Sequence, residues 1–245
     1  MKKFNLFISL ILTFAIMILG LALTVSSNDS FISLGGSLFL LSIGLLIFFA
    51  FKNNLSIRVS LRKINLKAIP YIIIISIANF LSVICIVCIA YFLKVGNFSE
   101  INDTPNLNII TIVGAVIIAP ISEELIFRAE FLGILLKKIP VHIAIVIQGF
   151  VFASVHCFSF NLASVKFYTV IIGGISFGYI FYYTKSILSS MLCHSFYNSI
   201  AVLTVKLTFT TKNTAIFIFS IFLAITSLVL IIYLIRKVKY TCSCR

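Results

Sequence analysis

Three of the six acidic residues in this chain lie within a single apolar stretch. Glu123, Glu124 and Glu130 share residues 119–133 with Arg128. A charged side chain at the centre of a membrane helix costs about 2.5–3.5 kcal/mol, so Glu123, Glu124 and Arg128 together would cost on the order of 8–10 kcal/mol before pairing. A cost of this size indicates that these side chains serve a function.

Glu124 and Arg128 can neutralise each other within one helix. They are four residues apart, so they share a helical face, and the acid precedes the base, which is the favourable order. This pairing leaves Glu123 rotated by about 100° around the helix, without a local partner. Glu123 should therefore face a neighbouring helix or water, and it is the strongest candidate for chemistry.

Two of the three histidines, His156 and His194, lie in other apolar stretches, and Asn198 follows His194 by four residues. At about 1.5 Å per residue from the expected cytoplasmic span ends, Glu123 lies about 21 Å deep, His156 about 24 Å, His194 about 14 Å and Asn198 about 20 Å. All four can thus share one level of the membrane. A carboxylate, two imidazoles and an amide can deprotonate water and hold the oxyanion that forms on an attacked carbonyl. Hydrolysis is therefore chemically feasible.

The elements that position these residues must be membrane helices. The chain is 61% hydrophobic and 10% charged, with a mean hydropathy of +1.21, which excludes a water-soluble globular domain. Apolar runs long enough for a hydrocarbon core of about 30 Å recur along the whole chain, so a cleaved signal peptide does not explain them. The runs are continuous rather than alternating, which favours helices over a barrel.

We predict an all-α, polytopic transmembrane bundle of about eight helices. The expected spans are residues 4–25, 31–51, 70–93, 107–136, 140–158, 167–184, 187–205 and 214–235. We divide the chain into N-terminal transmembrane helices 1–3 (1–106), a core (107–205) and a last helix with a basic tail (206–245).

The net charge of +13 comes from lysines and arginines clustered beside alternate span ends. The positive-inside rule places these ends, and both termini, in the cytoplasm, and an even number of spans agrees with this orientation. The basic excess is thus an orientation signal, and no nucleic-acid partner is expected. A composition rich in Lys, Ile, Asn and Phe is typical of a bacterial plasma membrane protein.

Small residues inside the spans predict close helix packing. Gly174 and Gly178 form a small-x-x-x-small pattern, with Gly173 beside it, that lets helix backbones approach each other. Cys85 and Cys88 form a C-x-x-C inside an apolar span, where we favour packing over redox or metal chemistry.

Three short motifs follow one another in three different spans. They are Glu-Glu-x-x-x-Arg at Glu123, Glu124 and Arg128, Phe-x-x-x-His at Phe152 and His156, and His-x-x-x-Asn at His194 and Asn198. In this order they resemble the CAAX protease and bacteriocin-processing (CPBP) family of intramembrane glutamic endopeptidases. The resemblance covers residues 107–203.

The resemblance implies a role for each matched residue. Glu123 and His156 would activate a water, and His194 and Asn198 would stabilise the oxyanion. The supporting residues would be Glu124, Arg128 and Phe152. Ala129 departs from the pattern, because the family commonly has glycine after the arginine.

The resemblance also raises the question of a metal cofactor. The family is associated with metal dependence, and zinc ligands could come from Glu123, Glu124, His156 and His194. Zinc requires bonds of about 2.0–2.2 Å in a roughly tetrahedral arrangement. We expect a site without a cofactor, with zinc as the alternative.

Three functions are compatible with these residues. The first is an endopeptidase that acts on a membrane-associated peptide or protein in the bilayer, with bacteriocin processing or self-immunity as the setting. The second is a non-catalytic membrane scaffold, which would bind a regulatory membrane partner such as a sensor kinase or act as an immunity factor. The third is a proton-coupled transporter, since intramembrane Glu, His and Arg also build proton relays. The absence of an evident internal repeat counts against the third.

Overall fold

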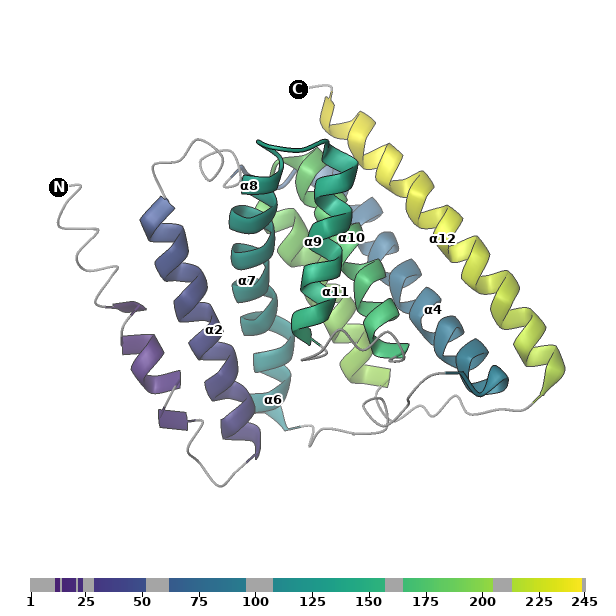
Figure 1. The fold of residues 1–245 in the computed structure, drawn as a ribbon, viewed down its shortest axis with the longest axis horizontal. Helices are drawn as coiled ribbons and strands as arrows, with labels where there is room; N and C mark the ends of the chain where they lie inside the picture. The colour runs from purple at the N-terminus through teal and green to yellow at the C-terminus, as the bar shows by residue number, and fades with distance from the viewer. Residues whose placement is uncertain are drawn as a thin grey trace.

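The computed structural model describes residues 12–13, 15–20, 22–23, 29–51, 62–95, 108–156, 165–204 and 213–243. Within these ranges the regular structure is helical and includes no strand. The helices pack side by side as a bundle (Figure 1). The predicted all-α membrane bundle is thereby confirmed.

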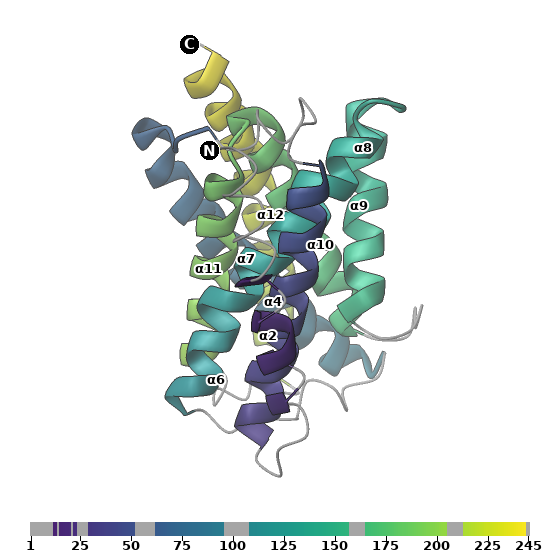
Figure 2. The same ribbon diagram turned by 90° about the vertical axis from the view of Figure 1, so that its left-hand side faces the viewer.

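The helical elements are bounded as follows: α2 (Asp29–Phe51), η1 (Leu66–Ala68), α4 (Ile69–Leu93), α6 (Ile109–Val113), η2 (Gly114–Ile118), α7 (Ala119–Glu124), η3 (Leu125–Leu132), α8 (Gly133–Leu135), α9 (Val141–His156), α10 (Val165–Thr184), α11 (Ile187–Thr204) and α12 (Thr214–Ser243). Segments α6 to α8 form one continuous helix, in which η2 and η3 are π-helical. This helix runs obliquely from one end of the bundle to the other (Figure 2).

Most predicted spans correspond to helices with closely similar limits. The largest difference is α12, which continues to Ser243 instead of ending at residue 235. The added turns carry Arg236, Lys237 and Lys239, so the helix extends past the apolar segment into a basic one. The predicted span at 4–25 and the end of the span at 140–158 lie wholly or partly outside the described residues.

Helices long and apolar enough to cross a membrane are found at four places within the described ranges: Leu66–Leu93, Ile109–Leu135, Val165–Thr184 and Thr214–Cys242. Shorter apolar helices lie at Leu34–Leu45, Val141–His156 and Ile187–Leu203. The turn between α8 and α9 lies at the same end of the bundle as the C-terminal end of α12 (Figure 1).

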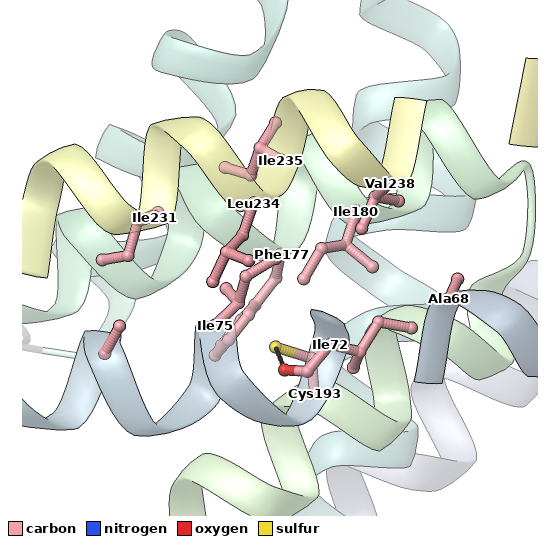
Figure 3. Close-up of a cluster of buried hydrophobic side chains, with 11 residues drawn as sticks. Ala68, Ile72, Ile75, Phe177, Ile180, Cys193, Ile231, Leu234, Ile235 and Val238 are labelled. Atoms are coloured by element: carbon pink, nitrogen blue, oxygen red, sulfur yellow. Dashed lines mark hydrogen bonds between the residues drawn. The ribbon is translucent and has the colours of Figure 1, made fainter. Parts of the chain in front are cut away.

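One cluster of buried side chains joins α4, α10, α11 and α12. Figure 3 shows α12 lying along α4, with Phe177 of α10 and Cys193 of α11 filling the space between them. In lipid these contacts stabilise the bundle through close packing. No hydrophobic driving force acts between the helices there, because lipid tails are as apolar as the side chains. Cys85 and Cys88 are both buried on α4, as the packing interpretation expects.

A second cluster joins η3 to α9, α10 and α11. Here α9 and α10 cross at glycines: a Cβ on Gly174 would lie 3.1 Å from Gly149 Cα. A Cβ on Gly178 would lie 3.1 Å from side-chain atoms of Gln148 and Ile145 on α9, whereas a Cβ on Gly173 would meet only the Phe177 ring, at 3.7 Å. The predicted close packing is thus confirmed for Gly174 and Gly178, and it brings α9 near the helix that carries the glutamates.

Candidate active site

Glu123 and both intramembrane histidines meet at one point in the bundle. His156 Nε2 lies 3.3 Å from Glu123 Oε2, and His194 Nε2 lies 3.7 Å from the same oxygen. The three residues come from α7, α9 and α11. The exposed fraction of the side chain is 13% for Glu123, 28% for His156 and 6% for His194. The structure therefore brings these three residues together, with His156 nearest the surface.

Glu124 is more deeply buried than Glu123 and lies at the centre of a network of polar side chains. Its Oε1 lies 2.9 Å from Arg128 Nη1 and 2.9 Å from His194 Nδ1, and its Oε2 accepts a hydrogen bond from Ser190 Oγ. Glu124 and Arg128 are completely buried. The predicted pair of Glu124 and Arg128 is confirmed, but its carboxylate also holds a histidine from another helix.

Arg128 is enclosed by aromatic rings. Its Cζ lies 4.4 Å from the ring centroid of Phe152 and 5.4 Å from that of Phe177. Its Nη2 donates to the Gly174 carbonyl, at 3.3 Å. A desolvated cation over an aromatic face gains about 2 kcal/mol. The guanidinium thus has a counter-ion, a carbonyl and two rings, which together offset the cost of its burial.

The same rings orient the histidines. The Phe177 ring stacks on His194 with centroids 4.7 Å apart, and the Phe152 ring lies 4.2 Å from His156. Because Phe177 also belongs to the cluster in Figure 3, the packing of α4 and α12 supports the position of His194.

The partners of the two Nδ1 atoms fix the tautomers of both histidines. His156 Nδ1 lies 2.8 Å from the Phe152 carbonyl, which can only accept, so Nδ1 carries the proton. His194 Nδ1 faces a carboxylate that is already paired with Arg128, so it donates as well. In a neutral histidine the remaining Nε2 then carries a lone pair. Both nitrogens and the Glu123 Oε2 atom are then hydrogen-bond acceptors. A proton, or the hydrogens of a water, must therefore lie between each nitrogen and this oxygen.

Asn198 makes a different contact from the other predicted residues. Its Nδ2 donates to the carbonyl of Ala115 in η2, at 2.8 Å. The predicted oxyanion role would use the second N–H of the same amide. The hydrogen bond fixes that amide against the helix that carries Glu123.

Two residues near the motif lie outside this network. Glu130 is buried, and within the described part of the chain its Oε1 has no hydrogen-bond partner. Ala129 is buried in the second cluster.

Sequence reasoning missed Ser190 and Phe177. Ser190 precedes His194 by four residues on α11, so helical spacing placed it on the same face. Phe177 gave no such signal, because one phenylalanine among 25 is not distinctive.

The four zinc ligands considered from the sequence do not form one set. Both oxygens of Glu124 are engaged by Arg128, His194 and Ser190. Over the described ranges, no group of three or more His, Cys, Asp or Glu side chains is arranged to hold a metal ion. With Glu124 engaged in this way, these four residues do not fit the tetrahedral zinc site that was considered as the alternative.

A helical membrane bundle with a buried glutamate and two histidines defines the class as a polytopic membrane protein with an enzyme-like intramembrane site. Residues 105–200 match the family model described as Rce1-like, type II CAAX prenyl endopeptidase, which describes a family of intramembrane proteases. The match includes all the residues of the site, and the resemblance to the CPBP family is confirmed. No curated protein and no solved structure was found to match the chain.

Proposed function

We propose that this protein is a glutamate-type intramembrane endopeptidase that hydrolyses a peptide bond of a membrane-associated peptide or protein. The observation that carries the proposal is the meeting of Glu123 Oε2 with the Nε2 atoms of His156 and His194, at 3.3 and 3.7 Å. The match to an intramembrane protease family supports the same class of reaction.

In the proposed mechanism, Glu123 and His156 activate the water. Because His156 donates its Nδ1 proton to the Phe152 carbonyl, its Nε2 can accept a proton from a water held against Glu123. The oxygen of that water then attacks the peptide carbonyl, and the pair delivers the proton to the leaving nitrogen. General acid–base catalysis of this kind contributes about 10²–10⁴-fold.

His194 stabilises the oxyanion that forms on the attacked carbonyl. It can donate from Nε2 only as an imidazolium, because its Nδ1 proton is directed at Glu124. The negative charge of the Glu124 carboxylate attracts the positive charge of that form. The second N–H of the Asn198 amide is the other proposed donor. Loss of one oxyanion donor costs about 10²–10³-fold in rate.

A comparison of peptides released by cells tests this proposal. Membrane and secreted peptides from cells with the native protein should include products that are absent from cells with Glu123→Ala. Glu130→Gln is the matched control, because this acid lies on the same helix outside the network. Cleavage by purified Glu123→Ala protein at the native rate would refute the proposal.

The scaffold alternative is separated by a second variant. A protein that acts only by binding should keep its cellular phenotype with His156→Ala, whereas a protease should lose it. Bacteriocin processing or self-immunity is the setting we propose to examine first. Reporter fusions at both termini test the proposed cytoplasmic orientation.

A further inference from the structure

The helix that carries Glu123 contains a carbonyl that its own backbone cannot satisfy. Where the helix becomes π-helical in η2, an N–H pairs with the carbonyl five residues earlier, and the Ala119 N–H accordingly binds the Gly114 carbonyl. The next pair in this pattern would join residue 120 to the Ala115 carbonyl. Residue 120 is proline, which has no N–H. The Ala115 carbonyl therefore needs a donor from elsewhere.

Asn198 supplies that donor from another helix. Its Nδ2 lies 2.8 Å from the Ala115 oxygen, and the amide is only partly buried. Asn198 lies one turn after His194 on α11, and Pro120 lies one turn before Glu123 on α7. The hydrogen bond thus joins the two helices one turn after His194 on α11 and about two turns before Glu123 on the other helix.

We propose that Asn198 is a positioning residue that holds α11 against the interrupted helix at Ala115, and so sets the separation of Glu123 and His194. The part of this proposal that concerns cleavage rests on the proposed function. The hydrogen bond and its purpose do not, because they follow from the missing N–H of Pro120. In lipid an unsatisfied backbone carbonyl is costly, so the bond should be strongly favoured.

Replacing Pro120 by a residue with a backbone N–H tests this positioning role of Asn198. The variants are Asn198→Ala, Pro120→Ala and the double variant Pro120→Ala/Asn198→Ala, measured in detergent micelles for apparent Tm and for kcat and KM of cleavage. Asn198→Ala alone should lower Tm by a few degrees and lower kcat. In the Pro120→Ala background the same change should have little effect on Tm, because the backbone N–H restored at position 120 now lets the helix satisfy Ala115 itself. It should also lower kcat less than in the native background, because only the proposed oxyanion donor is then lost.

Ser199→Ala is the matched control for this double-mutant cycle of Pro120 and Asn198. Ser199 is the next residue on α11, and its Oγ donates to the Ser195 carbonyl of its own helix, at 2.7 Å. Its effect should be the same in the native protein and in the Pro120→Ala background. If Pro120→Ala does not fold, Pro120→Ser returns the same N–H.

The outcomes separate this inference from the proposed function. Losses of both Tm and kcat that are smaller in the Pro120→Ala background than in the native background support positioning through Ala115. A smaller loss of Tm with an unchanged loss of kcat overturns it, because Asn198 would then affect cleavage through the substrate alone. Equal losses of Tm with and without Pro120 also overturn it. If neither the native protein nor any variant cleaves a peptide, the proposed function fails. The Tm values of the double-mutant cycle still decide whether Asn198 joins the two helices.

Discussion

Glu124 Oε1 and His194 Nδ1 lie 2.9 Å apart, although 70 residues separate them in the chain. The same oxygen lies 2.9 Å from Arg128 Nη1, so one buried carboxylate orients the histidine and neutralises the guanidinium. His194 is thereby held with its Nε2 toward Glu123.

Removing the charge of Glu124 should strongly destabilise the protein. Glu124→Gln leaves Arg128 as a buried charge without a counter-ion, which costs about 3–5 kcal/mol. The free energy of unfolding, measured by SDS titration, should fall by that amount. Glu124→Gln/Arg128→Met should recover part of the loss, because no uncompensated charge remains. A double variant less stable than Glu124→Gln would contradict this account.

Ser190 should be required for the orientation of the same carboxylate. Ser190→Ala removes a hydrogen bond to an ionised group, and such bonds contribute about 1.5–3 kcal/mol. We expect lower stability and slower cleavage. Ser189→Ala is the control, because Ser189 Oγ is equally buried but has no hydrogen-bond partner among the described residues. Equal effects of the two variants would show that the contact with Glu124 has no special importance.

Gly174 should tolerate no larger side chain. A Cβ at this position would lie 3.1 Å from the Gly149 backbone and 3.2 Å from Phe152 Cδ1. Gly174→Ala should therefore cost about 1–3 kcal/mol, and it should slow cleavage by displacing Phe152. Gly173→Ala has room, and the change from glycine in a helix favours it by up to about 1 kcal/mol. Thermal unfolding of both variants measures the contrast.

Cleavage should not require zinc. Both oxygens of Glu124 are already engaged, and the described residues hold no metal-binding group of three. Purified protein treated with a chelator and dialysed should cleave at the untreated rate, and added zinc should not increase it. Activity that disappears on chelation and returns only with zinc would reverse our preference for a metal-free site.

Anionic lipid should stabilise the end of the bundle where α10 turns into α11. Lys185 lies in this turn, over the Tyr182 ring at 3.7 Å, and the adjacent Ser186 Oγ donates to the Arg62 carbonyl at 2.7 Å. Burial and the positive charge of Arg62 lower the pKa of Lys185. An anionic headgroup would relieve this repulsion, with about 1 kcal/mol per cation near an anionic surface.

Vesicles of stated composition measure this effect. Apparent Tm should rise when phosphatidylglycerol is added to phosphatidylcholine, and Lys185→Gln should reduce the rise. Lys94→Gln, at the opposite end of α4, should leave it unchanged. An equal rise in all three proteins would assign the effect to the bilayer as a whole.

The positions of the helices could largely be predicted from the sequence. Continuous apolar runs define a membrane helix because lipid leaves the backbone no other partners, and this gave α4, α10 and α11 with closely similar limits. The pair of Glu124 and Arg128 could also be predicted, because a spacing of four residues fixes two side chains on one face. Both inferences depend only on neighbours along the chain.

The contacts between helices were decided by the tertiary structure alone. The sequence placed Glu123, His156 and His194 at similar depths, but depth does not fix how each helix is rotated about its axis. That rotation depends on the Gly149–Gly174 crossing and on the packing of Phe177, which place His194 Nδ1 on Glu124. The contact of Asn198 with Ala115 likewise depends on a π-helical turn, whose register no local spacing specifies.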